Sequence, residues 1–201
     1  MKFIVAKKIA LSLLITFSLL SCEKGANEKG MDFYQNKKYE EAITQFSAYL
    51  EAHPEDADTY FNRGRAYEQE KDYENALKDY QSAISANPNK EEFWLSSGIA
   101  NFKMKKFKST ISNMEGLLSL QENNGKAMVL KARAYAQIGK IKDAMETLND
   151  AISKSNKNGD AYLYRGLIRA NANDVKACDD LGQAKRLKTP KAIELMNKYC
   201  E

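Results

Sequence analysis

Small and apolar residues recur at helical spacing between charged residues along most of the chain. Within residues 57–90, Tyr60, Gly64 and Tyr67 follow an i, i+4, i+7 pattern that places them on one face of a helix. After a turn near Asp72 a second apolar face follows, and its members are Tyr73, Ala76, Leu77, Tyr80, Ala83 and Ile84. Pro88 ends this second helix, because a proline pushes the residue before it out of the α region. The stretch therefore predicts a helical hairpin.

The hairpin pattern repeats with a fixed step of 34 residues. Gly64 is preceded one step earlier by Gly30, and the later steps fall on Gly98, Ala132 and Gly166. Further series with the same step are Tyr39, Tyr73 and Phe107; Ala42 and Ala76; Phe46 and Tyr80; and Pro54 and Pro88. A fixed period in this range indicates stacked repeats. Glycine inside a helix costs about 1 kcal/mol relative to alanine. Its return therefore predicts a close approach of the two helices, at the small alanine of the second helix.

The pattern resembles the tetratricopeptide repeat family, whose period is the same. The resemblance is carried by Gly64, Tyr67, Tyr73, Ala76, Tyr80, Ala83 and Pro88, with Trp94 at the family's tryptophan position in the next repeat. It implies an all-α fold, a right-handed α-α superhelix of about five hairpins within residues 27–188. The repeats would cover about 23–56, 57–90, 91–124, 125–158 and 159–188. Residues 189–201 would add a C-terminal capping helix with Ile193, Leu195, Met196 and Tyr199 as its apolar residues.

The N-terminus carries a different signal. Three lysines (Lys2, Lys7 and Lys8) precede an uncharged run from Ile9 to Leu20. These twelve residues would span about 18 Å as a helix, too little for a bilayer core of about 30 Å, so residues 1–21 are interpreted as a signal peptide. The end of this run, LLSC, resembles the processing box of bacterial lipoproteins, and an ordinary signal peptide cleaved elsewhere is the alternative.

The lipoprotein resemblance implies that Cys22 receives lipid, such as palmitate, and becomes the first residue of the mature chain. Residues 22–26 would then form a short tether. The protein would be exported and anchored to a membrane of the bacterial cell envelope, the outer membrane if the cell is Gram-negative. Whether it faces the periplasm or the exterior stays open.

Charge and motif content narrow the function. Without the signal peptide the chain has 28 basic and 27 acidic residues, a balance that does not favour a nucleic-acid partner. The only histidine, His53, precedes Pro54 at a hairpin end, and the sequence contains no HExxH, CxxC, G-x-S-x-G or glycine-rich phosphate loop. We therefore expect no enzyme activity, no metal and no cofactor.

The other two cysteines, Cys178 and Cys200, are equidistant from residue 189, the middle of the turn before the last helix. In an antiparallel hairpin the two cysteines would lie opposite each other on the paired helices. The oxidising environment of an exported protein would permit a disulfide between them. Cys178 is expected at a buried apolar position. Two buried thiols are the alternative to the bond.

The resemblance further implies a concave groove, lined by the first helix of each hairpin, that receives a peptide or a helix of another protein. By repeat position its lining would be Met31, Phe61, Arg65, Leu95, Ile99, Phe102, Val129, Arg133, Leu163 and Leu167. Some of these residues could instead form core between repeats. Arg65 and Arg133 are candidate carboxylate anchors in an otherwise mostly apolar groove.

Three functions fit these features. The first is a non-enzymatic, lipid-anchored scaffold that holds a protein partner in the cell envelope. The second is a subunit of an envelope assembly machine for outer-membrane protein insertion or pilus biogenesis. The third, a cell-wall glycan-binding module, ranks last because most tyrosines occupy packing positions.

Overall fold

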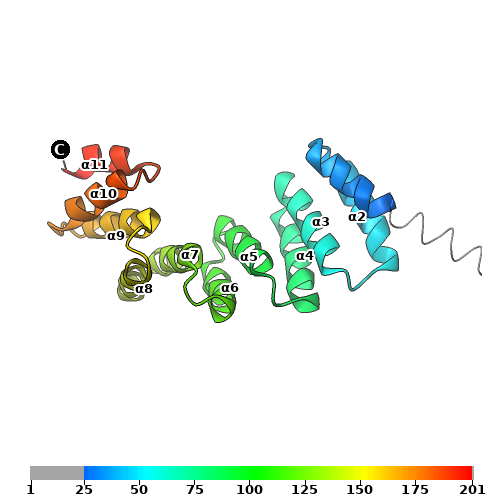
Figure 1. Cartoon of the computed structure of the whole chain (residues 1–201), viewed down its shortest axis with the longest axis horizontal. Helices are drawn as coiled ribbons and strands as arrows, with labels where there is room; N and C mark the ends of the chain where they lie inside the picture. The colour runs from blue at the N-terminus through cyan, green and yellow to red at the C-terminus, as the bar shows by residue number, and fades with distance from the viewer. Residues whose placement is uncertain (1–24, 201) are drawn as a thin grey trace, which may run out of the picture. The chain divides into compact units, whose positions relative to one another are not determined.

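The structure is a computed structural model that describes residues 25–200, and its regular elements within that range are all helices. Residues 25–35 form the first helix. It is followed by α2 (Tyr39–Ala52), α3 (Ala57–Gln69), α4 (Tyr73–Ala86), α5 (Glu91–Lys103), α6 (Phe107–Leu120), α7 (Gly125–Gln137), α8 (Ile141–Lys154), α9 (Gly159–Asn171), α10 (Ala177–Arg186) and α11 (Ala192–Cys200) (Figure 1). The signal peptide and Cys22 lie outside the described residues. Gly25 and Ala26, expected in the tether, already belong to the first helix.

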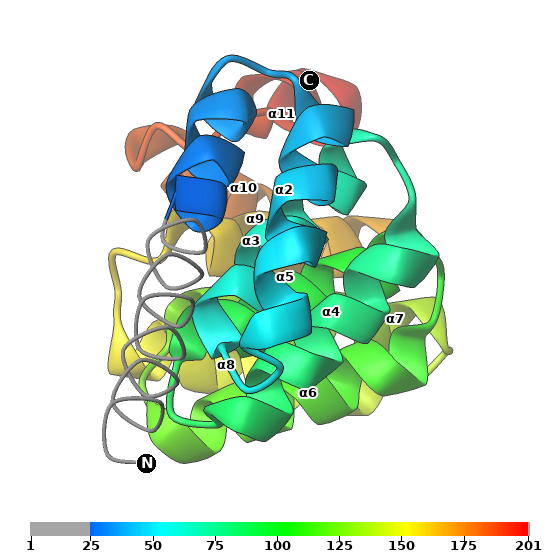
Figure 2. The same cartoon turned by 90° about the vertical axis from the view of Figure 1, so that its right-hand side faces the viewer.

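The chain divides into two compact units, and the division falls after Phe93, within α5. Unit 1 is residues 25–93 and unit 2 is residues 94–200. In unit 1, α2, α3 and α4 lie side by side in both views (Figures 1 and 2). In unit 2, consecutive helices pack from α6 to α11. Among the described residues, no helix has the length and hydropathy needed to cross a bilayer.

Four helices begin at an Asp or Asn whose side chain accepts a hydrogen bond from a backbone N–H three residues later. These residues are Asp56 before α3, Asp72 before α4, Asn124 before α7 and Asn158 before α9. The bond from Thr59 N to Asp56 Oδ1, for example, is 2.7 Å long. Such N-caps satisfy donors that the helix itself leaves without a partner. They fix where each helix starts.

The turn inside each hairpin has one residue in the left-handed region, and these residues are Lys37, Lys71, Lys105, Gly139 and Asn173. In the turn of residues 68–72 the N–H of Lys71 donates to the Glu68 carbonyl at 3.1 Å, and the N–H of Asp72 donates to the Tyr67 carbonyl at 2.9 Å. This pair of bonds is a Schellman motif. Its recurrence ends the first helix of every hairpin in the same way.

The repeated glycine makes room for a large side chain of the second helix. A Cβ at Gly64 would lie 2.8 and 2.9 Å from two ring carbons of Tyr80, and 3.2 Å from the Ala76 carbonyl oxygen. The closest neighbour is therefore the tyrosine ring rather than the alanine expected from the sequence. The equivalent pairs are Gly30 with Phe46, Gly98 with Met114 and Gly166 with Leu181. In the fourth hairpin Ala132 and Leu148 are buried in one cluster.

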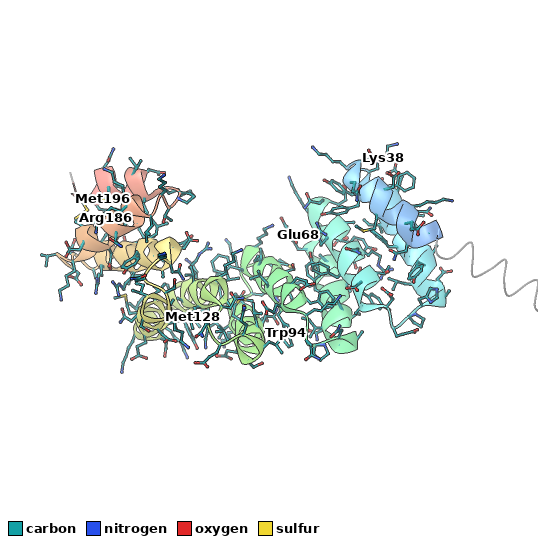
Figure 3. All side chains as sticks on the ribbon, viewed as in Figure 1. Lys38, Glu68, Trp94, Met128, Arg186 and Met196 are labelled. Atoms are coloured by element: carbon teal, nitrogen blue, oxygen red, sulfur yellow. A yellow bond between two sulfur atoms is a disulfide. The ribbon has the colours of Figure 1, made fainter. Side chains whose placement is uncertain are left out.

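The core is spread between neighbouring helices. In unit 1 it includes Ala42, Phe46 and Ala66. In unit 2 one cluster centres on Met114, Leu117, Ala127 and Leu130, a second on Met128, Val129 and Leu148, and a third on Leu163, Leu181, Ala184 and Ala192. Trp94 of α5 is labelled in Figure 3. Its indole ring packs over Gly116 of α6, where an added Cβ would meet the ring. The buried apolar residues are therefore spread over several clusters along the helices rather than gathered in one.

A buried ion pair joins three helices in each unit. In unit 1, Arg63 donates to both carboxylate oxygens of Asp79 at 2.8 Å and to Ser47 Oγ at 3.0 Å, which links α3 to α4 and α2. The hydrogen bond to Asp79 raises the pKa of Arg63. In unit 2, Arg165 pairs in the same way with Asp180 and donates to Asn149.

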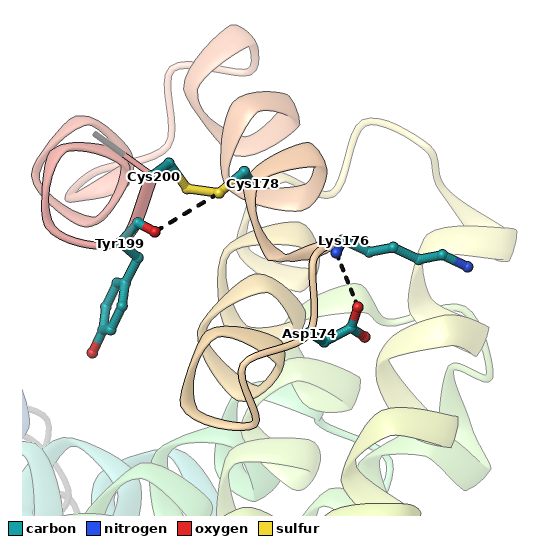
Figure 4. The surroundings of a disulfide bond; sticks show 5 residues. All are labelled: Asp174, Lys176, Cys178, Tyr199 and Cys200. Carbon is teal, nitrogen blue, oxygen red and sulfur yellow. Dashed lines mark hydrogen bonds between the residues drawn. A yellow bond between two sulfur atoms is a disulfide. The ribbon is translucent and has the colours of Figure 1, made fainter.

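The last helix covers the end of unit 2. Ala192 is buried, and Leu195, Met196 and Tyr199 pack against the cluster of Leu163 and Leu181. Ile193 is 60% exposed, so its assignment to the apolar face was wrong. The Ile193 side chain lies away from the face of α11 that carries Leu195, Met196 and Tyr199. Cys178 and Cys200 are joined by a disulfide, with Cα atoms 5.7 Å apart (Figure 4). Cys178 is half-buried rather than fully buried.

Candidate functional site

A pocket of about 530 Å³ opens in unit 2 beside the first helices of three successive hairpins. Its lining comes from α5 (Phe102), α7 (Arg133, Ala136 and Gln137), α8 (Ile141 and Leu148), α9 (Tyr164, Leu167, Ile168 and Asn171) and Ala172. Most of these side chains are apolar, and one is charged. A concave, mainly apolar pocket with few polar groups is the usual form of a binding site.

The charged residue, Arg133, lies between two aromatic rings. Its guanidinium carbon is 4.6 Å from the ring centroid of Phe102 and 4.6 Å from that of Tyr164. Phe102 is itself held edge-on by Phe107, with ring centroids 5.3 Å apart. Cation–π contacts of this kind fix the position of an arginine. Among the described residues, no carboxylate forms an ion pair with Arg133, so its N–H groups are available to a ligand.

Two side-chain amides border the apolar wall. Gln137 and Asn171 are both exposed and are the last residues of α7 and α9. They occupy equivalent positions in successive hairpins. An amide offers both a donor and an acceptor, which matches the backbone of a peptide. The pocket thus combines a fixed positive charge, aliphatic surface and two amides.

The sequence-predicted groove residues of unit 2 divide into two groups. Phe102, Arg133 and Leu167 line the pocket. Ile99 is 36% exposed outside it, and Leu95 packs against the core of Met114 and Leu117.

Two of the groove predictions in unit 2 were wrong. Val129 and Leu163 are only 6% and 5% exposed, because the neighbouring hairpin covers them. They belong to the core between repeats.

In unit 1, the predicted groove residues Met31, Phe61 and Arg65 lie against aromatic rings or core side chains. The guanidinium carbon of Arg65 lies 4.7 Å from the ring centroid of Tyr34 and 5.8 Å from that of Phe61. Phe61 also contacts the rings of Tyr80 and Phe93, with centroids 5.7 and 4.9 Å away. Met31 packs against the core of Ala42 and Phe46. Phe61 and Met31 therefore contribute to packing within this unit.

The sequence analysis missed Tyr164, Gln137 and Asn171. A signal for the tyrosine existed, because Phe102 and Tyr164 lie equally far before and after Arg133, at 31 residues. Tyr34 precedes Arg65 by the same 31 residues. The amides share the step of 34 residues with the other repeated positions. These spacings could have pointed to the pocket.

A second, more polar pocket of about 670 Å³ lies at the loops before α7, α9 and α11. Its lining includes four lysines, Lys126, Lys154, Lys157 and Lys188. Lys154 donates to Glu122 at 2.6 Å, and this hydrogen bond lowers the pKa of Glu122. Part of the positive charge here is therefore already balanced by the protein's own carboxylates.

The two units carry opposite charge. Residues 94–201 contain 19 basic and 11 acidic side chains, a net charge of +8. Residues 25–93 contain 8 basic and 15 acidic side chains, a net charge of −7. The pocket with Arg133 therefore belongs to a strongly basic unit, which favours acidic partners.

Groups typical of catalysis do not gather at the pocket. Within the described range, no cluster of His, Cys, Asp and Glu has the geometry of a metal site. The ring of His53 lies 4.3 Å from that of Tyr49 in unit 1. The groups that line the pocket of unit 2 are suited to binding.

Stacked hairpins of equal length, with the same turn and packing residues in each, define an α-helical repeat protein. Two tetratricopeptide repeat family models match the sequence, over residues 27–91 and 101–168. The chain belongs to the tetratricopeptide repeat family. No curated protein matches it.

Solved structures share the fold. A MamA crystal structure matches with a TM-score of 0.75 and 18% identity, covering 89% of this chain and 96% of MamA. MamA from Desulfovibrio magneticus RS-1, residue 41 to the end, matches with a TM-score of 0.74 and 17% identity over 83% and 94% of the two chains. YrrB, described as a TPR protein with an unusual peptide-binding site, matches with a TM-score of 0.71 and 18% identity over 86% and 90%. These likenesses confirm the all-α repeat fold.

Proposed function

We propose that this protein is a non-enzymatic, lipid-anchored scaffold that holds a protein partner in the bacterial cell envelope, through the pocket of unit 2. The observation that carries the proposal is Arg133, fixed between Phe102 and Tyr164 beside an apolar wall, with no carboxylate partner among the described residues. Membership of the tetratricopeptide repeat family supports a protein partner. The peptide-binding site named for YrrB supports it too.

The anchor is proposed from the sequence. The lysines, the short apolar run and the cysteine that follows it support export and lipid attachment at Cys22. Metabolic labelling with an alkyne-bearing fatty acid should mark the wild-type protein and leave Cys22→Ala unmarked. Equal labelling of both proteins would contradict the lipid anchor, but it would not bear on the proposed binding pocket.

Photo-crosslinking in cells tests the pocket. A crosslinking amino acid at Leu167 should give a discrete protein adduct, because that side chain lines the pocket. The matched control is the same amino acid at Val175, which is 89% exposed and lies outside the pocket. An adduct that forms equally from both positions, or from neither, would contradict the proposed binding surface.

The alternatives make different predictions. A subunit of an assembly machine would co-purify with a stable membrane complex, whereas a scaffold for one partner would yield a single adduct. A glycan-binding module would be retained on cell-wall polymer without protein. The pocket offers little support for glycan binding, because the guanidinium of Arg133 already stacks on both Phe102 and Tyr164.

A further inference from the structure

We infer that the pocket of unit 2 selects a protein segment that places an acidic side chain on Arg133 and adjacent aliphatic side chains on the apolar wall. The inference rests on the proposed function and names the chemistry of the partner. It applies to residues of α5, α7, α8 and α9 alone, all within unit 2.

The geometry of Arg133 favours a carboxylate. The rings of Phe102 and Tyr164 both lie 4.6 Å from the guanidinium carbon, on helices α5 and α9. The N–H groups of a guanidinium held between two rings point outward in the plane of the guanidinium. A carboxylate in that plane accepts two parallel hydrogen bonds from them. Because the side chain is already held in place, less conformational entropy is lost on binding.

Comparison with the neighbouring arginines shows what Arg133 lacks. Arg165 donates to both oxygens of Asp180, at 2.9 and 2.6 Å, and Arg169 donates to the same carboxylate at 2.6 Å. Arg169 also pairs with Asp174 at 3.5 Å, so both arginines have carboxylate partners inside the fold. Arg133 is also half-buried, yet no acidic residue of the described chain takes that place. The net charge of +8 over residues 94–201 attracts acidic partners to the same unit.

The rest of the pocket indicates a protein segment rather than a free anion. Ile141, Leu167 and Ile168 provide an aliphatic wall, which a small anion would leave uncovered. Gln137 and Asn171 can each bond to the backbone of an extended segment, whose N–H and C=O groups are not already paired. The pocket volume of about 530 Å³ suits a few side chains at once.

The experiment selects peptides on the protein. The full chain is purified in detergent and immobilised, and a random library of peptides about 12 residues long is passed over it. We expect the enriched peptides to carry Asp or Glu beside Leu, Ile, Val or Met. Peptide Kd values are then measured by fluorescence anisotropy with the wild type and with Arg133→Gln. The matched control is Lys142→Gln, which removes the same charge from an exposed side chain of α8.

Arg133→Gln should raise the Kd by about ten- to a hundredfold, as expected for the loss of a two-bond ion pair. Replacing the peptide's Glu by Gln should cost a similar factor, and the two changes together should cost no more than either one. Lys142→Gln should leave the Kd within about twofold. Thermal unfolding of Arg133→Gln, compared with the wild type, checks that the fold is kept.

Two results would overturn the inference in different ways. If enriched peptides bind but lack acidic residues, or bind Arg133→Gln as tightly as the wild type, the acidic preference is wrong and the proposed peptide-binding function stands. If no peptide is enriched over a blank surface, the proposed function fails together with the inference.

Discussion

Replacing Gly64 by alanine sets two opposing effects against each other in α3. Alanine favours a helix over glycine by about 1 kcal/mol. The new methyl group would lie 2.8 Å from a ring carbon of Tyr80 and 3.2 Å from the backbone oxygen of Ala76. Tyr80 is 0% exposed, and its hydroxyl donates to Glu68 at 2.8 Å, so the ring has little room to move. Overpacking of this kind costs about 1–3 kcal/mol. We expect a net loss of up to about 2 kcal/mol.

The fourth hairpin shows how the clash can be relieved. There Ala132 takes the glycine position, and the smaller Leu148 takes the tyrosine position in one buried cluster. Tyr80→Leu alone should cost about 2–4 kcal/mol through lost packing and the lost bond to Glu68. In the presence of Gly64→Ala the leucine should cost less, because the methyl group fills part of the space. The coupling between the two changes should be about 1–3 kcal/mol.

Urea unfolding followed by circular dichroism at 222 nm gives the four free energies of this cycle. The matched control is Gly182→Ala in α10, where a Cβ would meet only the distant end of Arg186, at 3.9 Å. That variant should gain up to about 1 kcal/mol from helix propensity. If Gly64→Ala were stabilising to the same degree, or if the two effects in the cycle simply added, the glycine would have no packing role.

Three further predictions concern the turns, Tyr80 and the disulfide. Lys71 and Gly139 share the left-handed turn position, at φ 63° and 76°. Lys71→Gly should therefore raise the free energy of unfolding in urea by up to about 1 kcal/mol, and Gly139→Ala should lower it by about 1 kcal/mol. A change of the same sign in both variants would contradict this. Burial and the charge of Glu68 raise the pKa of Tyr80, so the unfolded chain loses the Tyr80 proton at a lower pH than the folded chain. The free energy of unfolding should therefore fall by about 1.4 kcal/mol from pH 9 to 11, relative to Tyr80→Phe. A pH dependence identical in both proteins would argue against it. Replacing Cys178 and Cys200 by alanine should lower the free energy of unfolding, measured by calorimetry, by about 3 kcal/mol. Two thiols that react with an alkylating reagent in the non-reduced wild type would show that no disulfide forms.

Much of the fold could be predicted because its packing and turn positions repeat. Gly64 and its equivalents mark the close contact in each hairpin, and Pro54 and Pro88 mark hairpin ends. The left-handed turns could not be predicted, since lysine occupies that position in three of the five hairpins and only Gly139 has the usual residue. There the Schellman hydrogen bonds, rather than the preference of the residue, hold the conformation.

The pocket was only partly predictable, for a geometric reason. Val129, Leu163 and Leu167 are all aliphatic residues on first helices of unit 2. The first two are buried by the neighbouring hairpin, and Leu167 faces the pocket. Which of them is covered depends on how far each hairpin is rotated against the next. The period places Val129 and Leu163 at one repeat position and Leu167 with Arg133 at another, but it does not say which position the next hairpin covers.

Net charge shows why an average taken over the chain can conceal a site. The near balance of 28 basic and 27 acidic residues in the mature chain is the sum of an acidic and a basic unit. Charges act over about 10 Å at ordinary salt, so the charges close to the pocket matter more to a ligand there than the chain total. Within unit 2 Asp180 pairs with Arg165 and Arg169, and Asp174 pairs with Arg169 as well. Arg133 has no carboxylate partner among the described residues, so its charge is left for a ligand, and binding of an acidic segment should weaken as salt is added.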